Sequence, residues 1–349
     1  MRTAILGAGY MGSAIAFPLS DNGVRVNLWG TWLDDDLIAG ARAGCHPRLD
    51  KAMPAGVHLY ESGQLAEAMA DTDFIILAVT SEGFVPVFEK MLKVLDKPVP
   101  LLTVTKGFVE INDAIHTISG GADLMFRRKF GEAIPGWVSI GGPVKAVELS
   151  NKIPSATIFG YRGDNMPPLF EHFASPYYRI YSVPDVTGTE ICSAFKNIYA
   201  IVMGICDGLY GNIDASLYHN FKALLFNHAI REIAFLADSE GGQRDTAFHL
   251  AGVGDFYVTS ASGRNGALGR LIGAGQPPKS AYRRMLDAEE IPEGYHTMQL
   301  GRPYLEAGDA SRLEHLPLFN CLYRIIFEQA DARKELFDFA SGWDTQGLP

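Results

Sequence analysis

Short runs of apolar residues alternate with longer mixed segments through the first half of the chain. The runs are rich in Val, Ile, Leu and Phe and are bounded by Gly, Pro, Asp or Ser, as in buried strands. They are Thr3–Leu6, Val24–Trp29, Phe74–Val79, Leu101–Val104 and Trp137–Ile140. Continuous apolar runs are typical of a parallel sheet that is covered on both faces.

The segments between these runs, such as Ser13–Asn22 and Gln64–Ala70, are long enough to form crossover helices. Strands that alternate with crossover helices form βαβ units, in which successive strands are parallel. The pattern therefore predicts an N-terminal α/β domain with a doubly wound sheet.

Helical patterns replace the strand-like runs after Val183. The predicted helices are Glu190–Leu209, Ser216–Ala237, Ala267–Ile272, Lys279–Leu286 and Leu316–Ala332. In the first of them, apolar residues recur at steps of four and three from Ile191 to Leu209, which forms one apolar stripe. We expect a C-terminal all-helical domain, with a boundary near Pro184–Asp185 and domains at 1–185 and 186–349.

Composition and charge exclude several classes of protein. The chain has 349 residues, and its net charge of −10 leaves no basic tract for a nucleic-acid backbone. No uninterrupted apolar run approaches the roughly 20 residues that cross a bilayer, and the first residues do not resemble an export signal. The four cysteines are scattered without a C-x-x-C pair, and no H-E-x-x-H motif is present. We expect a cytoplasmic protein that binds no metal and no nucleic acid and has no membrane span.

A G-x-G-x-x-G motif follows the first predicted strand and opens a helix. It consists of Gly7, Gly9 and Gly12, with Tyr10 and Met11 between the last two. The first glycine permits a tight turn, the second lets a diphosphate approach the backbone, and the third allows close packing of helix and strand. The motif in this setting predicts dinucleotide binding.

The sequence distinguishes NAD from NADP only weakly. The carboxylate that often follows the second strand would lie near Gly30 or Thr31, and neither is charged. No Arg occupies that turn to bind a 2′-phosphate, whereas Asp34, Asp35 and Asp36 follow closely. These acidic residues either contact the ribose or begin a solvated helix. The absence of an Arg and the nearby acidic residues slightly favour NAD.

Lys196 is the only charged side chain in the apolar stretch from Ile191 to Cys206. An ammonium group is costly to bury unless it is paired or neutralised, so we expect burial to lower the pKa of Lys196. A lysine with a lowered pKa is suited to general base catalysis. The alternative is a lysine that reaches solvent at the rim of the helix.

Two further polar clusters support a catalytic interpretation. Lys106 follows directly from an apolar strand, at the end where parallel sheets bind ligands. Asp255 and Thr259 lie in a glycine-rich stretch that leads to Arg264 and Asn265. Arg264 could bind a phosphate through two parallel hydrogen bonds. Each cluster taken alone is also compatible with a structural turn.

Taken together, these motifs resemble the NAD(P)-dependent glycerol-3-phosphate dehydrogenases over essentially the whole chain. The matching segments are GAGYMG, LWG, TKG, GGP at 141–143, FKN at 195–197, GVGDFYVT, GRN at 263–265 and IPEG at 291–294. The resemblance implies a Rossmann-type N-terminal domain, a helical C-terminal domain and an active site in the cleft between them.

The resemblance also implies roles for individual residues. Lys196 matches the catalytic base, and we expect Lys106 and Asp255 to assist it. Substrate-binding positions are matched by Lys106, Gly142, Asn197, Asp255, Thr259, Arg264 and Asn265. Cofactor-binding positions are matched by Gly7, Gly9, Tyr10, Met11, Gly12, Lys106, Ala146, Arg264, Ile291 and Glu293.

Three departures from the family pattern affect the expected substrate. Val144 stands where the family commonly has Ser or Thr, Gly263 stands where it usually has Ser, and Asn227-His228 stands where it usually has Thr-Arg. Two hydroxyl groups and one guanidinium are therefore missing near the expected cleft. Another phosphorylated ketose or polyol is an alternative to glycerol 3-phosphate and dihydroxyacetone phosphate.

The expected activity is reversible oxidation of a secondary alcohol on a small phosphate ester, with Lys196 as general acid and base. One alternative is a β-hydroxyacid or ketopantoate-type dehydrogenase that acts on a carboxylate. Another is a dinucleotide-binding sensor without turnover, which would have no need of a buried base. We also expect a homodimer.

Overall fold

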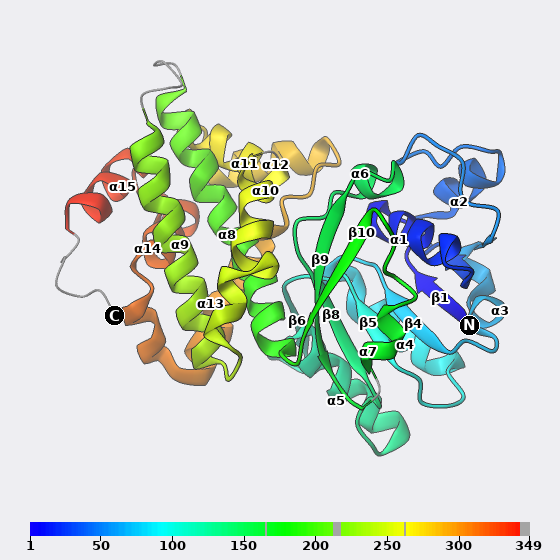
Figure 1. The fold of residues 1–349 in the computed structure, drawn as a ribbon. Coiled ribbons are helices and arrows are strands. Elements are labelled where there is room, and N and C mark those ends of the chain that lie inside the picture. The colour runs from blue at the N-terminus through cyan, green and yellow to red at the C-terminus, as the bar shows by residue number, and fades with distance from the viewer. Residues whose placement is uncertain (165, 212–217, 262, 343–349) are drawn as a thin grey trace. The chain divides into compact units, whose positions relative to one another are not determined.

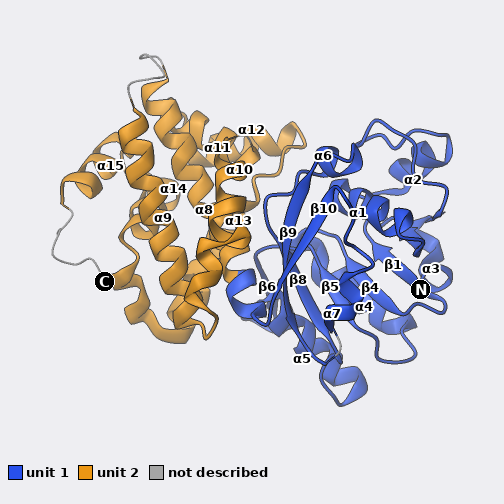
Figure 2. Ribbon diagram, in the orientation of Figure 1, with its two compact units in different colours: residues 1–190 blue, residues 191–349 orange. Residues whose placement is uncertain are grey.

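The computed structural model describes residues 1–164, 166–211, 218–261 and 263–342. The chain divides into two compact units, residues 1–190 and residues 191–349 (Figure 2). We call them unit 1 and unit 2. The predicted boundary at 185/186 lies a few residues before this division.

Unit 1 is built around an eight-stranded sheet with the order β10-β9-β8-β5-β4-β1-β2-β3 (Figure 1). Its strands are β1 (Arg2–Leu6), β2 (Arg25–Trp29), β3 (Val57–Tyr60), β4 (Phe74–Leu77), β5 (Leu101–Thr103), β8 (Trp137–Gly141), β9 (Ser155–Arg162) and β10 (Tyr178–Val183). From β3 to β8 all neighbouring strands are parallel. All five predicted strands are present.

The far edge of the sheet departs from the pattern expected of βαβ units. β9 pairs with β8 in antiparallel orientation, and β10 then pairs with β9 in parallel. A separate antiparallel hairpin, β6 (Phe108–Ile111) and β7 (Ala114–Thr117), follows β5. The sequence pattern predicted none of these four strands, nor β3.

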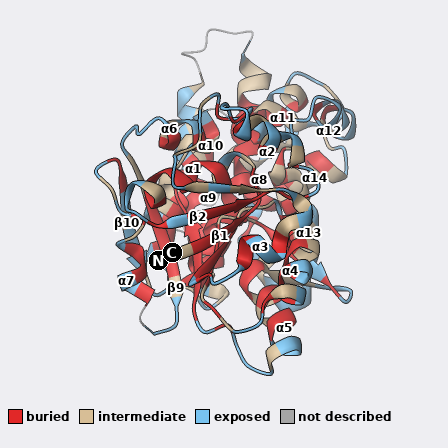
Figure 3. Cartoon of the chain, turned by 90° about the vertical axis from the view of Figure 1, so that its right-hand side faces the viewer, coloured by how far each residue is buried: buried red, intermediate tan, exposed pale blue. Residues whose placement is uncertain are grey.

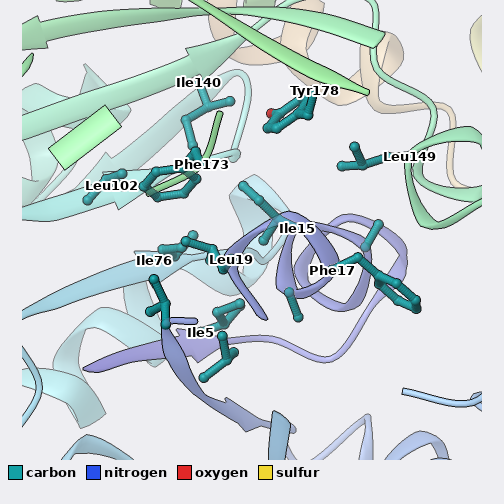
Figure 4. Packing of buried hydrophobic residues seen from close by; sticks show 14 of the residues in the cluster. Ile5, Ile15, Phe17, Leu19, Ile76, Leu102, Ile140, Leu149, Phe173 and Tyr178 are labelled. Atoms are coloured by element: carbon teal, nitrogen blue, oxygen red, sulfur yellow. The ribbon is translucent and has the colours of Figure 1, made fainter. Parts of the chain in front are cut away.

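Helices cover both faces of the sheet, which confirms the doubly wound fold. Alternate residues of β1 point to opposite faces, because Ile5 packs in one apolar cluster while Ala4 and Leu6 pack in another. The first cluster includes residues of α1 (Tyr10–Asp21), α2 (Asp35–Arg42), α6 (Ala146–Ser150) and α7 (Met166–Phe170) (Figure 4). The second includes residues of α3 (Leu65–Met69), α4 (Ser81–Val94) and α5 (Ile118–Phe130). The central strands are accordingly buried (Figure 3).

The described part of unit 2 contains helices and no strand, as predicted. The helices are α8 (Val186–Tyr210, which begins in unit 1), α9 (His219–Ser239), α10 (Asp255–Ala261), α11 (Arg264–Gly273), α12 (Pro278–Asp287), α13 (Glu293–Asp309), α14 (Pro317–Phe327) and α15 (Ala332–Ser341). Shorter turns are Arg244–Phe248, Leu250–Gly254 and Ala310–His315. Of the helix predicted at 216–237, residues 216 and 217 lie outside the described residues.

One predicted helix is wrong. The span Leu316–Ala332 is not continuous, because α14 ends at Phe327 and α15 begins at Ala332. The side chain of Asp331 caps α15 by accepting a hydrogen bond from the backbone N–H of Lys334, at 2.7 Å. This capping carboxylate starts a new helix where the apolar pattern alone suggested that the first one continued.

Among the described residues, α8 is the one helix long and apolar enough to cross a membrane by length and composition. Its most apolar window is 89% buried inside the protein. A helix that is buried in this way is typical of a protein core.

Glycines bring α8 and α11 into close contact within unit 2. A Cβ at Gly204 would lie 2.1 Å from the carbonyl oxygen of Gly266, and a Cβ at Gly269 would lie 2.0 Å from that of Ile201. Real Cβ atoms do not approach this closely, so no larger residue fits at Gly204 or Gly269. We call this contact the glycine seam. It holds the start of α11 beside α8.

The first turn of α8 is bonded into unit 1. The buried carboxylate of Glu190 accepts hydrogen bonds from the backbone N–H of Ser119 at 3.1 Å, from its hydroxyl at 2.8 Å, and from the hydroxyl of Ser139 at 2.6 Å. Burial raises the pKa of Glu190, and these hydrogen bonds oppose that rise. Glu190 therefore ties the start of α8 to α5 and β8.

Candidate functional site

The glycine turn of unit 1 has the geometry that a dinucleotide needs. Gly7 follows β1 with a φ of +117°, and a Cβ there would lie 2.5 Å from the carbonyl oxygen of Ala78. A Cβ at Gly12 would lie 2.0 Å from the carbonyl oxygen of Gly7, so the turn and the helix packing both require glycine. A Cβ at Gly9 would meet only a flexible arginine end, Nη1 of Arg48, at 3.3 Å.

The start of α1 is also suited to an anion. Gly9 is its N-cap residue, no side chain caps the helix there, and its first turn contains no acidic residue. Backbone N–H groups at such a position attract phosphate. Tyr10 is 49% exposed beside them, while Met11 packs against the apolar cluster that contains Ile5. The residues of the G-x-G-x-x-G motif therefore fit a bound dinucleotide.

Two of the three acidic residues behind the preference for NAD are hydrogen-bonded within the protein, whereas the third, Asp36, is exposed. Asp34 is buried, and its Oδ2 accepts hydrogen bonds from the backbone N–H groups of Ala8 and Thr31 and from the Thr31 hydroxyl, at 3.3, 3.0 and 2.8 Å. Asp35 accepts from the backbone N–H and hydroxyl of Ser62. The choice between NAD and NADP therefore rests on neither carboxylate.

Three more candidate residues of unit 1, Lys106, Gly142 and Ala146, come after the carboxyl ends of strands in the sheet. The Thr105 hydroxyl donates to the carbonyl oxygen of Val79 at 2.8 Å, which joins the turn after β5 to the turn after β4 and places Lys106 next in the chain. Gly142, with a φ of +117°, directly follows β8, and Ala146 begins α6. β4, β5 and β8 are adjacent and parallel, so their carboxyl ends lie on the edge where open α/β sheets bind ligands.

Unit 2 brings Lys196, Asp255 and Thr259 together. Lys196 is 4% exposed, and its Nζ donates to Oδ1 of Asp255 at 2.9 Å and to the hydroxyl oxygen of Thr259 at 2.7 Å. The Thr259 hydroxyl lies 3.3 Å from the same Asp255 oxygen and donates to it. The sequence left open whether Lys196 is buried or reaches solvent, and the structure shows a buried lysine in an ion pair. We call these three residues the lysine cluster.

Asp255 owes its position to an irregular stretch of helix. Residues Leu250–Gly254 form one π-helical turn immediately before α10, and Asp255 is the first residue of α10. A Cβ at Gly252 in that turn would lie 1.9 Å from the carbonyl oxygen of Ala247. Such π turns occur frequently at functional sites.

A chain of hydrogen bonds links the neighbouring candidate residues. The backbone N–H of Gly294 donates to Oδ1 of Asn265 at 2.9 Å, so the Asn265 amide nitrogen faces Asn197 and donates to its Oδ1 at 3.0 Å. The Asn197 amide nitrogen then donates to Glu293 at 3.3 Å. Each amide orientation is fixed by its neighbour, and Asn197 follows Lys196 directly, so this chain of bonds adjoins the lysine cluster.

Arg264 and Ile291 flank this chain of bonds. Arg264 begins α11, pairs with Glu293 at 3.6 Å and keeps about half of its side chain exposed (49%). Ile291 is partly buried two residues before α13. The exposed guanidinium of Arg264 remains accessible to an anionic group.

The three departures from the family pattern occupy different surroundings. Val144 is partly buried and packs against the apolar cluster of unit 1. Gly263 is the N-cap of α11, and a Cβ there would lie 3.1 Å from the carbonyl oxygen of Thr259, so a serine would fit tightly. His228 is buried with its ring nearly perpendicular to that of Phe339, and burial lowers its pKa to about 4, while Asn227 is exposed.

Within the described residues, no group of three or more His, Cys, Asp or Glu side chains is placed to hold a metal ion. Two features were not predicted from the sequence: the glycine seam, and the contact between Arg48 and the glycine turn. The seam has a signal in the sequence, because Gly204 and Gly208 are four residues apart, as are Gly269 and Gly273. The Arg48 contact depends on tertiary structure and has no such signal.

Comparison with known families gives a match to each half of the chain. The family described as NAD-dependent glycerol-3-phosphate dehydrogenase N-terminus matches residues 2–166, and the corresponding C-terminus family matches residues 185–336.

Individual relatives agree with these matches. An NADP(+)-dependent glycerol-3-phosphate dehydrogenase of Archaeoglobus fulgidus is 31% identical over 98% of this chain and 99% of its own length. A glycerol-3-phosphate dehydrogenase [NAD(P)+] of Carboxydothermus hydrogenoformans is 31% identical over 97% of this chain and 95% of its own length. The crystal structure of glycerol-3-phosphate dehydrogenase from Coxiella burnetii has a TM-score of 0.81 and 25% identity, covering 97% of this chain and 98% of the other.

Proposed function

Because the chain belongs to the NAD-dependent glycerol-3-phosphate dehydrogenase family, we propose that it interconverts glycerol 3-phosphate and dihydroxyacetone phosphate. Membership confirms the expectation of an oxidoreductase that acts on a CH–OH group with NAD or NADP. The observation that carries the finer proposal is the lysine cluster, a buried proton donor held by a carboxylate and a hydroxyl.

The chemistry requires one hydride and one proton. A nicotinamide cofactor, when bound, would supply or accept the hydride. In ketone reduction, Lys196 as an ammonium donates the proton to the developing alkoxide oxygen, and in alcohol oxidation the neutral amine takes it back. Asp255 stabilises the ammonium form, and Thr259 fixes the direction of Nζ. Lys196 is therefore proposed as the general acid and base, and Asp255 and Thr259 as its positioning residues.

The substrate phosphate is assigned to Arg264. Its guanidinium is half exposed, and the 3.6 Å contact with Glu293 orients it. Guanidinium groups recognise phosphate through paired, charge-assisted hydrogen bonds. The remaining substrate and cofactor roles implied by the family resemblance stay predictions, as does a role for Lys106 in stabilising charge on the substrate oxygen.

Initial rates with a panel of substrates test this proposal. Dihydroxyacetone phosphate, a longer ketose phosphate, dihydroxyacetone and ketopantoate should each be assayed with NADH and with NADPH. We expect turnover with dihydroxyacetone phosphate and at least a tenfold lower kcat/KM without the phosphate. Preference for ketopantoate would support a carboxylate-acting dehydrogenase instead. Dinucleotide binding without turnover of any of these compounds would support a sensor.

A cytoplasmic location and a homodimer also stay predictions. Light scattering of the purified chain during gel filtration measures its mass against the 38.1 kDa of one chain. A mass of one chain would contradict the homodimer.

A further inference from the structure

Arg48 lies at the point of the glycine turn that a dinucleotide approaches. Its Nη1 is 3.3 Å from the position that a Cβ at Gly9 would take, and its guanidinium lies over the ring of Tyr10, 5.5 Å from the ring centre. Arg42, by comparison, is engaged with Glu61, whereas Arg48 has no carboxylate partner among the described residues. An exposed guanidinium therefore lies beside the backbone N–H groups at the start of α1.

A buried histidine holds Arg48 in this place. The backbone N–H of Arg48 donates to Nδ1 of His46 at 3.3 Å, and Nε2 of His46 lies 3.0 Å from the carbonyl oxygen of Ala8 and 2.9 Å from the hydroxyl of Ser13. His46 has no exposed surface. Because Nδ1 accepts a hydrogen bond, Nε2 carries the proton and donates to Ala8. Burial favours this neutral form by lowering the pKa of His46.

This contact joins a distant segment to the glycine turn itself. Ala8 lies between Gly7 and Gly9, and Ser13 directly follows Gly12, so His46 is hydrogen-bonded within the motif and immediately after it. Arg48 is two residues further along the chain. The backbone at Arg48 is therefore positioned by the same turn that would hold the cofactor.

We propose that Arg48 binds the diphosphate of the dinucleotide, opposite the backbone N–H groups of the glycine turn. The second glycine of such motifs is where a diphosphate comes closest to the backbone, and Nη1 lies over that glycine. The two negative charges of the diphosphate would lie between the N-terminus of α1 and the guanidinium of Arg48. The guanidinium would form charge-assisted hydrogen bonds with them. The two coenzymes share the diphosphate, so Arg48 contributes equally to the binding of NAD and of NADP.

The position of Arg48 favours the diphosphate over the adenosine 2′-phosphate of NADP. A 2′-phosphate is normally bound at the turn after the second strand, which here is Gly30–Thr31. Arg48 is instead in contact with Tyr10 and near Gly9, in the glycine turn itself. The two possibilities give different results with the two coenzymes.

Binding titrations of the full-length chain test the proposal without an activity assay. Arg48→Ala and Arg48→Lys should be titrated with NADH, NADPH, ADP, AMP and adenosine 2′,5′-bisphosphate, with folding checked by thermal melting. Arg25→Ala is the matched control, since Arg25 begins β2 and is exposed at the opposite end of the strand.

Arg48→Ala should weaken NADH, NADPH and ADP alike, by about ten- to a hundredfold, and AMP clearly less. Arg48→Lys should recover part of the loss, and Arg25→Ala should bind like the unchanged protein. A loss confined to NADPH and the 2′,5′-bisphosphate would overturn the proposal in favour of a 2′-phosphate contact. Unchanged binding in Arg48→Ala would show that Arg48 does not contact the dinucleotide and would overturn the proposal.

The assignment of Arg48 rests on the dinucleotide binding of the proposed function. Different experimental results would contradict the assignment and the dinucleotide binding. A wild-type chain that binds neither NADH nor NADPH contradicts dinucleotide binding as a whole. A wild-type chain that binds both, with an unaffected Arg48→Ala variant, contradicts only the assignment of Arg48.

Discussion

The ammonium group of Lys196 is held by two oxygen atoms and is almost completely shielded from water. Removing one partner of a buried ion pair leaves the other charged and unpaired, which typically costs about 3–5 kcal/mol. An isolated buried amine would behave in the opposite way, because its replacement by an apolar side chain would stabilise the fold. The pairing with Asp255 therefore decides the sign of the effect on stability.

Lys196→Met should lower turnover at least a hundredfold, since the general acid–base contribution is typically about 10²–10⁴-fold. It should also lower the melting temperature, because Asp255 loses its partner. Turnover, coenzyme titration and thermal melting measure the three effects, and coenzyme affinity should be nearly unchanged. Lys222→Met is the control, since Lys222 forms a 2.8 Å ion pair with Asp207 in the same unit. A folded Lys196→Met variant that keeps most of its turnover would remove Lys196 from the mechanism.

Arg264→Ala should raise the KM for dihydroxyacetone phosphate by about ten- to a hundredfold, because it removes a charge-assisted phosphate contact. The KM for unphosphorylated dihydroxyacetone should change little. Steady-state kinetics with the two ketones provide the comparison. Equal increases for both would mean that Arg264 acts only by holding Glu293.

At the scale of elements, the glycine seam brings the polar residues of α8 close to those of α11. α8 carries Lys196 and Asn197, α11 carries Arg264 and Asn265, and the seam sets the separation of these two helices. The hydrogen bond between Asn197 and Asn265 requires that separation. A wider spacing of the helices would break the hydrogen bonds that orient Glu293.

Gly269→Ala should destabilise unit 2 by about 1–3 kcal/mol, since it forces extra volume into a closely packed contact. It should also reduce kcat/KM, because α11 must move away from α8. Gly266→Ala on the same helix is the matched control, as a Cβ there would lie at ordinary contact distances, 3.6 Å from Nη1 of Arg270 and 3.9 Å from the carbonyl oxygen of Ser260. That change should be neutral or stabilising by up to about 1 kcal/mol, from helix propensity alone. Denaturant unfolding measures both, and a stabilised Gly269→Ala variant would contradict the seam.

At the scale of the whole molecule, the response of stability to pH depends on a buried carboxyl group. Glu232 of α9 accepts hydrogen bonds from the Tyr199 hydroxyl of α8 at 2.5 Å and from the backbone N–H groups of Leu318 and Phe319 at the start of α14. Burial raises its pKa from 4.5 to about 7, against the opposing effect of these bonds. Three helices therefore meet at one titratable group.

A folded-state pKa above the unfolded one means that the folded protein holds this proton more tightly. The stabilisation from Glu232 is full below pH 4.5 and is lost as the pH rises toward 7. The free energy of unfolding of the wild type should therefore fall, relative to Glu232→Gln, by on the order of 2–3 kcal/mol between pH 5 and pH 8. Urea unfolding of both proteins at the two pH values measures the difference. A constant difference would contradict the raised pKa.

Local patterns predicted the parts of the fold that local forces determine. The five central strands are continuous apolar runs, and the apolar stripe of α8 repeats with helical period, so both could be recognised from the sequence. The reversed direction of β9 could not, because strand direction depends on how the chain returns to the sheet. The break at Asp331 was missed because one capping side chain outweighed the apolar pattern.

The candidate site likewise has features that the local sequence predicts and features that depend on tertiary structure. Lys196 could be singled out as a lone charge in an apolar helix, but its pairing with Asp255 joins residues 59 positions apart. The contact of His46 with Ala8 spans 38 positions. Chemical type is visible in a sequence, whereas the partners of a side chain are set by tertiary structure. The roles of the lysine cluster and of the His46 contact therefore stay predictions until variants are measured.

Glu190 has a consequence for attempts to produce unit 1 as a separate fragment. A fragment that ends at Asp185 would lack the carboxylate that accepts from Ser119 and Ser139, and it would lose Val186 from the apolar cluster that contains Ala4 and Leu6. Each polar group left buried without a partner costs about 1–3 kcal/mol, a large share of the stability of a typical domain. The helix that leads into the second half of the chain is thus also the last piece of the first half, and a truncation placed where the helix begins would remove it.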